Sequence, residues 1–455
     1  MGFSSKSSEK SLFLRYALLS GMGYFMDGYN LTVIAVFTFI IETYKTMPYT
    51  PLQIGFASGS ALLGAMFGAL IFGRYSDLAG RKYIYSFYLA FFIVFPILGA
   101  VSGNINEVII FRFLLGIGIG ADYAIGPVYS TEMIPDHVRG TGYGLVWAFW
   151  SLGASLAFVL GYIGFIYNGV NAWRLAFAII SIPAVIVLVY RLGVPESIRW
   201  EKAGTKSRMD SAYGSNDVST LPPGVSGNNA HRTNSSIFEL FHGDYGKRTA
   251  IIWIQWILLD IGSYGFALYA PLLIGTFGIF GSETFIITAI LYAVGFVGAL
   301  ISMSWNDRFG RRPLQVMGFG LMSLGMALMA IALDLHGLLI FVFGMAGLLL
   351  WYGIENIGPG NTVGLYAIEL LPTKLRSTSM GSATAVTRFV SFMSAFEFPF
   401  IVASLGDSWF FYILLIVMLG AFIFTFLFTP ETRGITLDQM EDSVYRLHRI
   451  IPKQK

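Results

Sequence analysis

Long apolar stretches separated by short polar loops run along almost the whole chain. A helix that crosses a membrane needs about 20 mostly apolar residues, and about twelve stretches of that kind can be traced. Six precede Pro195, at about 14–41, 52–73, 83–102, 106–131, 140–165 and 172–193, and six follow Lys247, at about 249–276, 282–304, 313–333, 337–369, 378–403 and 408–429. We therefore predict twelve membrane-spanning helices.

A polar segment separates the two groups of six helices. Residues 201–236 are rich in Gly, Ser and Asn, as is typical of a linker. The pattern predicts an N-terminal six-helix bundle over residues 1–195 and a central loop over 196–246. A C-terminal six-helix bundle with a tail is predicted over 247–455.

The composition indicates the same class of protein. Hydrophobic residues make up 55% of the chain and charged residues 12%, whereas soluble domains carry about 25% charged residues. So few charges cannot cover a water-exposed surface, which indicates an integral membrane protein whose partner is the lipid bilayer. Because there is no cysteine, we expect no disulfide, and we also expect no metal ion and no cofactor. The net charge of +3 is spread along the chain and does not suggest a nucleic-acid partner.

Positively charged residues are unequally shared between the two sets of loops. They cluster in the loops after the second and eighth predicted helices, in the central loop and in both tails, while the opposite loops carry little beyond Lys45 and Arg174. The first residues, MGFSSKSSEKSLFLRYALL, lack the cleavage pattern of a signal peptide. Because basic loops stay in the cytoplasm, we expect a multi-pass plasma-membrane protein with both termini and the central loop cytoplasmic.

The two halves carry matching motifs in one register. GRYSDLAGRK (73–82) matches SWNDRFGRR (304–312), YSTEMIPDHVRGTGYG (129–144) matches YAIELLPTKLRSTSMG (366–381), and PESIR (195–199) matches PETR (430–433). Asp27 in the first predicted helix corresponds in the same way to Asp260 in the seventh. Each pair is about 230 to 240 residues apart, and a shared register of this kind indicates an internal repeat.

The repeated charges are candidates for contacts that hold neighbouring helices together at the cytoplasmic side. The spacing predicts four pairs: Asp77 with Arg81, Asp307 with Arg311, Glu132 with Arg139, and Glu369 with Arg376. Alternating access requires contacts that break when two halves rock against each other, so we interpret these residues as a gating latch. Any single Arg or Lys among them is explained equally well as a topology signal.

Together these motifs resemble those of the major facilitator superfamily. The motif RFLLGIGIGADYAIGPVYSTEMIPDHVRG (112–140), with PESIRW and PETRG, resembles the sugar porters, and GIGIGADY with WILLDIGSYG resembles the related phosphate:proton symporters. The seventh helix lacks the paired glutamines and asparagine of true sugar porters. The resemblance implies an all-α integral membrane fold with twelve transmembrane helices in two pseudo-symmetric six-helix bundles.

Several charged residues fall inside the predicted helices. Each costs about 2.5–3.5 kcal/mol at the bilayer centre on insertion scales, so such residues usually face a cavity and act on ions or substrate. The candidates are Asp27, Arg112, Asp122, Asp260, Glu355, Arg388 and Glu397. Arg112 opens the fourth helix and is expected to be structural, paired or reaching toward the membrane edge. Glu355 is either a ligand or a stabiliser of a broken tenth helix.

The seventh helix places an acid between two aromatic hydrogen-bond donors. Trp256, Asp260 and Tyr264 are spaced i, i+4 and i+8 and therefore share one helical face. In the phosphate symporters the corresponding face contributes to the substrate site, so we expect these residues to bind substrate. The alternative is an acid that only makes hydrogen bonds between helices.

The resemblance also implies residues for proton transfer and anion binding. Asp27 and the Asp122–Tyr123 pair match positions that the phosphate symporters link to protons and substrate, and a carboxylate in a low-dielectric cavity exchanges protons readily. We expect proton coupling at Asp27, Asp122 and Asp260 and substrate binding at Tyr123. Arg388 replaces that family's lysine and suits an anion, or forms an ion pair with an intramembrane acid such as Glu355 or Glu397.

Trp150 stands where the phosphate symporters have a glutamine, and it reshapes the expected pocket. The leading hypothesis is a proton-coupled symporter that works by alternating access on a small solute, with inorganic phosphate first. A sugar or an organic anion remains an alternative substrate. A non-transporting sensor on a transporter scaffold is a further alternative. No nucleotide-binding loop is present in the sequence, so we predict no enzyme activity, and we expect a monomer.

Overall fold

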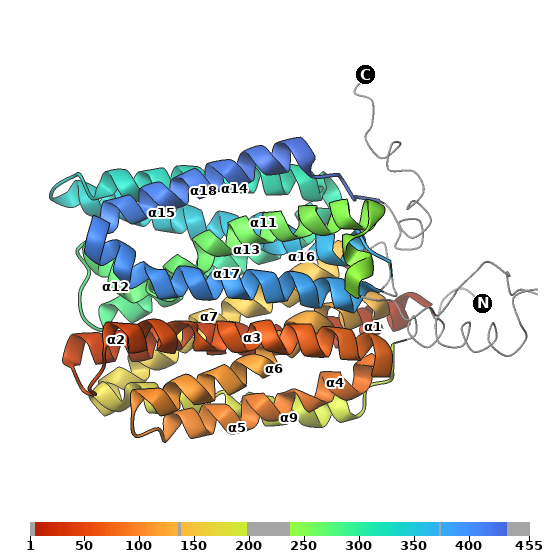
Figure 1. Ribbon diagram of the computed structural model, residues 1–455, viewed down its shortest axis with the longest axis horizontal. Coiled ribbons are helices and arrows are strands. Elements are labelled where there is room, and N and C mark those ends of the chain that lie inside the picture. The colour runs from red at the N-terminus through yellow and green to blue at the C-terminus, as the bar shows by residue number, and fades with distance from the viewer. Residues whose placement is uncertain (1–4, 135–137, 198–236, 373–374, 435–455) are drawn as a thin grey trace, which may run out of the picture.

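The computed structural model describes residues 5–134, 138–197, 237–372 and 375–434, and within these ranges every regular element is a helix. Figure 1 shows long helices that run side by side along one axis. The first half contains α1 (Ser5–Thr32), α2 (Ile34–Tyr44), α3 (Pro51–Ala79), α4 (Arg81–Phe87), α5 (Leu89–Ala100), α6 (Ile105–Met133), α7 (Arg139–Asn168), α8 (Ala172–Ala178) and α9 (Ser181–Leu192). The second half contains α11 (Gly243–Ala267), α12 (Ala270–Thr276), α13 (Glu283–Phe309), α14 (Arg311–Ala332), α15 (Leu338–Ile357), α16 (Pro359–Glu369), α17 (Arg376–Leu405) and α18 (Asp407–Phe428).

These helices form twelve membrane crossings, as the sequence pattern predicts. Eleven described segments are long and apolar enough to cross a membrane, and one of them, Gly140–Leu192, is 53 residues long. At 1.5 Å per residue that segment would be about 80 Å long, more than twice the bilayer core. It bends at Gly169, where φ is +54°, so it makes two crossings. Of the predicted central loop, residues 198–236 lie outside the described part of the chain, as do residues 435–455 of the tail.

Several crossings are interrupted near their middle or end. The tenth predicted helix breaks between α15 and α16, where Gly358 precedes Pro359. Proline is tolerated as the first residue of a helix because the N–H that it lacks would have no partner there. In the first crossing α1 passes into α2 at Val33, whose backbone stays right-handed helical at φ −59° and ψ −21°. The break at Gly358 is therefore the place where the second part of a crossing can change direction.

Small residues bring helices α3 and α6 into backbone contact. A Cβ atom added to Gly116 or Gly120 would lie 2.1 Å from the Ala61 carbonyl oxygen or 2.0 Å from that of Ala65, closer than atoms can approach. Only glycine fits there. The GIGIG stretch (116–120) therefore allows the close helix packing that is common among membrane helices. It fixes α6 against α3.

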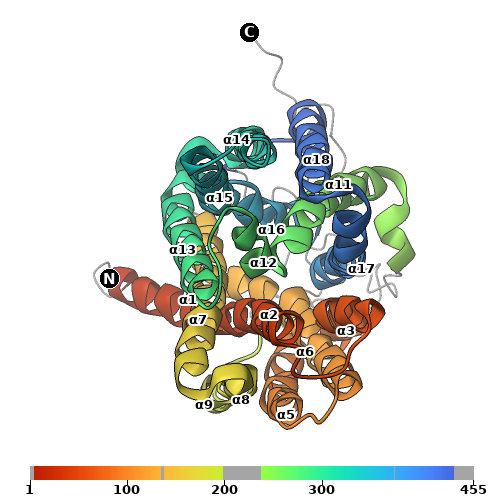
Figure 2. The ribbon, with the colours of Figure 1, turned by 90° about the vertical axis from the view of Figure 1, so that its left-hand side faces the viewer.

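The two halves meet along two pairs of helices. Helix α3 packs beside α17, and α7 packs beside α13, as Figures 1 and 2 show from two directions. In each pair one helix comes from the first half and the other from the second. The space between the two pairs is where a site shared by both halves can form.

Candidate functional site

A pocket lies at the centre of the bundle, between the two halves. The space between its lining residues is about 480 Å³ with open solvent included, and about 30 Å³ of it admits the centre of a water-sized sphere. Helix α7 contributes residues from the first half, and α11, α13, α15 and α17 contribute residues from the second. The polar and aromatic lining residues are Trp147, Trp150, Asp260, Ser263, Tyr264, Phe266, Tyr292, Trp351, Tyr352, Glu355, Asn356 and Arg388.

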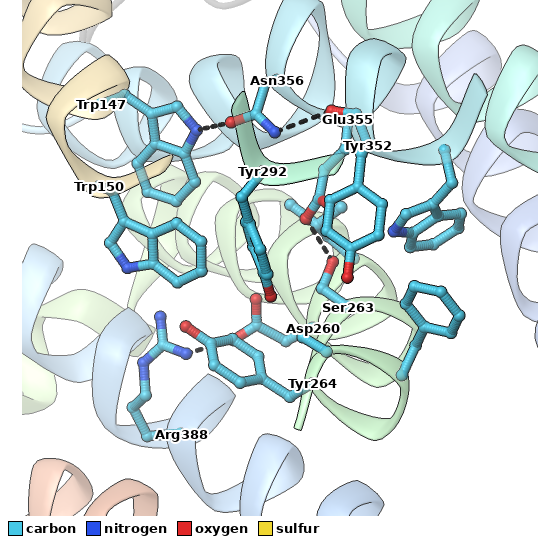
Figure 3. Close-up of a pocket in the computed structure, with 14 residues that line it drawn as sticks. Trp147, Trp150, Asp260, Ser263, Tyr264, Tyr292, Tyr352, Glu355, Asn356 and Arg388 are labelled. Atoms are coloured by element: carbon cyan, nitrogen blue, oxygen red, sulfur yellow. Dashed lines mark hydrogen bonds and ion pairs between the residues drawn. The ribbon is translucent and has the colours of Figure 1, made fainter. Parts of the chain in front are cut away.

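One side of the pocket holds a buried ion pair (Figure 3). The Arg388 guanidinium lies 3.2 Å from the Asp260 carboxylate, and the Ser391 hydroxyl donates a hydrogen bond of 2.9 Å to the same oxygen. Arg388 also lies over two aromatic rings, 4.6 Å from the ring centre of Tyr123 and 4.5 Å from that of Tyr264. Because Tyr123 belongs to the first half, this cation contacts both halves.

The opposite side of the pocket holds Glu355 and Asn356, at the end of α15. The Ser263 hydroxyl donates a hydrogen bond of 2.6 Å to Glu355. The amide oxygen of Asn356 accepts hydrogen bonds from the Trp147 indole at 3.0 Å and from the Ser151 hydroxyl at 2.8 Å. Since Trp147 and Ser151 lie on α7, these two bonds join the halves next to the break in the tenth crossing.

Two further acids lie inside the first half. Asp27 is completely buried, and neither carboxylate oxygen has a hydrogen-bond partner among the described residues. Asp122 accepts a hydrogen bond from the Tyr88 hydroxyl, which in turn is bonded by Arg191. The Arg191 guanidinium also donates to the Tyr85 carbonyl oxygen at 3.0 Å. Asp122 is therefore linked to a cation through one tyrosine, whereas Asp27 has no such link.

The pocket brings together only part of the predicted substrate site. Trp150, Asp260, Tyr264 and Arg388 line it, while Tyr123 packs behind Arg388 and is not a lining residue. Trp256 is buried and also lies outside the lining, although it shares a helical face with Asp260. The predicted proton residues Asp27 and Asp122 are separate from the pocket.

Sequence reasoning missed several lining residues: Trp147, Ser263, Tyr292, Trp351, Tyr352 and Asn356. Their helices are apolar on nearly every face, so hydropathy does not show which face points inward. Glu355 was named as a candidate from the sequence because a carboxylate in an apolar helix is costly. Arg191 has the same signal, but it lies in the last turn of α9, where a basic residue reads as a topology signal.

Two other charged residues differ from expectation. Arg112 is 3% exposed and donates a 3.0 Å hydrogen bond to the Asn30 carbonyl oxygen. It lies inside the bundle, bonded to the first crossing, and does not reach toward the membrane edge. Glu397 is exposed on α17, and the acid that pairs with Arg388 is Asp260.

A cluster of ion pairs lies at the end of the bundle where α3 meets α4. Arg81 contacts both Asp77, at 3.2 Å, and Glu132, at 2.9 Å. In the second half Arg311 contacts Asp307 at 3.1 Å and Glu369 at 3.0 Å. The pairs predicted within GRYSDLAGRK (73–82) and SWNDRFGRR (304–312) are present.

The same acids also reach across to the other half. Asp77 accepts hydrogen bonds from the backbone N–H and hydroxyl of Thr378 at 2.8 and 2.7 Å. Asp307 accepts the equivalent bonds from Thr141 at 3.0 and 2.9 Å. Thr378 and Thr141 lie in the first turns of α17 and α7, where unpaired N–H groups favour a carboxylate.

Neither of the two predicted glutamate–arginine pairs is found among the described residues. Arg376 contacts Glu132 of the other half at 3.2 Å, although the sequence predicted Glu369 as its partner. Glu369 contacts Arg311. The predicted partner of Glu132, Arg139, has a side chain that lies outside the described residues. The ion pairs therefore join the halves at this end as well as stabilising each half.

A model of the family described as "Sugar (and other) transporter" matches residues 16–443. The chain is 29% identical over 424 residues to the inner membrane metabolite transport protein YgcS of Escherichia coli (strain K12), covering 93% of this chain and 92% of YgcS. It is 26% identical over 478 residues to the probable inorganic phosphate transporter 1-6 of Arabidopsis thaliana, covering 93% and 92%.

Solved structures with a similar fold include the proton:xylose symporter XylE of the major facilitator superfamily, bound to 6-bromo-6-deoxy-D-glucose. The TM-score is 0.80 at 21% identity, covering 95% of this chain and 99% of that chain. The TM-score with the inward-open conformation of XylE from E. coli is 0.69 at 22% identity, covering 94% and 99%. Helices, motifs and similarity agree: this chain belongs to the sugar (and other) transporter family and is a membrane transporter of the major facilitator superfamily, not an enzyme.

Proposed function

We propose that this protein is a proton-coupled symporter of a small organic solute with hydroxyl groups. The observation that carries the proposal is the lining of the central pocket. Aromatic faces from Trp147, Trp150 and Tyr292 stand beside the hydrogen-bonding groups of Asn356 and Glu355. Flat aromatic surfaces with a few directed polar groups suit an organic molecule that has both apolar and hydroxyl-bearing surfaces.

The charge balance of the pocket favours this solute class over an inorganic anion. Arg388 is already paired with Asp260 at 3.2 Å, and Glu355 adds a second carboxylate to the lining. An anion would therefore enter a site whose single cation has a partner and whose remaining charge is negative. Like charges in a site with little water repel strongly.

Inorganic phosphate is the second candidate. The observation in its favour is the motif of Asp122 and Tyr123 together with the Trp256–Asp260–Tyr264 face. Relatives named as inorganic phosphate transporters match most of the chain. For phosphate to bind, Asp260 would have to give up Arg388 or carry a proton.

Proton coupling is assigned to Asp27. Its carboxylate is buried without a hydrogen-bond partner among the described residues, and an isolated charge there is costly. A proton that joins and leaves this group would compensate that charge during the cycle. Asp122 is a second candidate, restrained by its bond to Tyr88.

The cycle is alternating access by a monomer in the plasma membrane. The ion pairs and hydrogen bonds of Asp77, Asp307 and Glu132 hold the two halves together at one end. Because the loops at that end are rich in Lys and Arg, we assign it to the cytoplasm, together with both termini. Breaking these contacts opens the inward path.

Uptake into proteoliposomes tests the proposal. A panel of sugars, polyols and inorganic phosphate is offered with and without an inward proton gradient. We expect at least one hydroxylated organic solute to accumulate only with the gradient. Accumulation of phosphate without uptake of any organic solute would favour the second candidate, and binding without transport of any compound would favour a sensor.

A further inference from the structure

The pocket holds a carboxylate that the proposed mechanism does not use. Glu355 lines the pocket and receives one hydrogen bond, from the Ser263 hydroxyl at 2.6 Å. No arginine or lysine forms an ion pair with it among the described residues. A hydrogen bond from a serine hydroxyl does not neutralise a charge, so the Glu355 carboxylate is balanced either by a proton or by a positive charge on a ligand.

Glu355 and the Asp260–Arg388 pair lie on different sides of the pocket. Figure 3 shows Tyr292 between them, with Glu355 next to Tyr352 and Arg388 next to Tyr264. The two carboxylates therefore differ in what they can do. Asp260 is occupied by its arginine, whereas Glu355 is available to a ligand.

The surroundings of Glu355 are those of a site for an organic cation. Tyr292 and Tyr352 meet edge to face with ring centres 4.7 Å apart, and Trp147 and Trp150 are stacked with ring centres 5.9 Å apart. Aromatic faces attract ammonium groups through their ring electrons, most strongly when water is excluded. A proton alone would not need an aromatic enclosure, whereas an ammonium group gains from both the rings and the carboxylate.

Unpartnered polar groups also point to a ligand in this pocket. The indole N–H of Trp150 is buried and has no hydrogen-bond partner in the part of the chain that the structure describes, and the buried hydroxyls of Tyr292 and Tyr352 have only each other as partners. All three residues line the pocket. Buried polar groups normally have partners, so a bound solute with hydroxyl groups would satisfy them.

We propose that the solute carries an ammonium group that binds the Glu355 carboxylate and is surrounded by the aromatic side chains of Trp147, Tyr292 and Tyr352. This inference rests on the proposed function and narrows its solute class to hydroxylated amines. Glu355 is then a specificity-determining residue. It selects the ammonium form of a solute over its neutral counterpart.

Matched probes isolate the charge. D-glucosamine is compared with D-glucose, and choline with 3,3-dimethylbutan-1-ol, its uncharged isostere. Binding to the full-length protein in detergent is measured by calorimetry near pH 6, where the amine of glucosamine is protonated. We expect the ammonium member of at least one pair to bind tenfold or more tightly than its neutral partner, as a charge-assisted contact implies.

The variant Glu355→Gln tests the residue. The amide keeps the shape and the bond with Ser263 but has no charge, so the preference for the ammonium member should fall to about twofold or less. The matched control is Glu397→Gln on α17, an exposed glutamate outside the pocket, which should keep the preference. Glu355→Asp should retain part of it.

The outcomes separate this inference from the proposed function. If the neutral members bind as tightly as the ammonium members, or if Glu355→Gln keeps the full preference, Glu355 does not select a cation, although organic solute transport stands. If neither member of any pair binds and phosphate does, the proposed function fails and the inference fails with it.

Discussion

Asp27 and Asp260 occupy matching positions in the sequences of the two halves, but they differ in whether the carboxylate has a partner. Asp260 is paired with Arg388 at 3.2 Å and bonded by Ser391. Asp27 is as deeply buried but has no hydrogen-bond partner among the described residues. Both halves thus carry the acid, but of the two only Asp260 has a guanidinium within ion-pair distance among the described residues.

This difference suggests a division of labour between the halves. A paired carboxylate holds a fixed arrangement of groups, which suits the wall of a substrate pocket. A buried, unpaired carboxylate can exchange a proton without breaking an ion pair, which suits coupling. The same residue type therefore has two roles, set by whether a guanidinium lies within reach.

The largest expected effect is on coupling. Asp27→Asn should abolish accumulation of solute against its gradient, because an amide cannot carry the exchanged proton. Counterflow exchange, which needs no net proton movement, should persist. Both are measured in proteoliposomes with an imposed pH gradient, and full accumulation by the variant would remove Asp27 from the coupling mechanism.

The same substitution at the two positions should have different effects on stability. Asp260→Asn leaves Arg388 buried without its counter-charge, which costs about 3–5 kcal/mol, whereas Asp27→Asn removes an unpaired acid and should not destabilise. Thermal unfolding in detergent compares the two variants with the parent. The double variant Asp260→Asn/Arg388→Gln should recover part of the loss; equal loss in both single variants would contradict the comparison.

A smaller effect is expected at the ion-pair cluster. Asp77→Asn and Asp307→Asn each weaken one contact between the halves, to Thr378 or Thr141. Each change should slow transport about five- to tenfold, equivalent to about 1 kcal/mol, with little change in equilibrium binding. Turnover and calorimetry are measured together, and weaker binding with unchanged turnover would argue against a gating role.

The smallest effect is expected where the halves meet at the pocket. Trp147→Phe removes one hydrogen bond to Asn356, while the Ser151 bond remains. We expect a loss of about 1 kcal/mol or less, measured as a change of a few-fold in solute affinity. Trp409→Phe, at an exposed site on α18, is the control and should match the parent.

The sequence by itself determined the number of crossings, the internal repeat and the positions of the buried charges. Hydropathy reveals the membrane-spanning helices because each of them needs about 20 apolar residues. A charge such as Asp260 or Glu355 stands out in an apolar helix because its burial is costly. The pairs Asp77–Arg81 and Asp307–Arg311 were predictable because an acid and an arginine recur four residues apart at corresponding places in both halves.

Only the tertiary structure decided which partners these groups have. Arg388 pairs with Asp260 on another helix, Arg376 with Glu132 of the other half, and Asn356 with Trp147 across the pocket. In helices that are apolar on almost every side, no sequence period shows which face points inward. Which side chains become partners depends on how the helices are rotated and how they cross when they pack. Packing depends in turn on the fit of side chains from segments far apart in the chain.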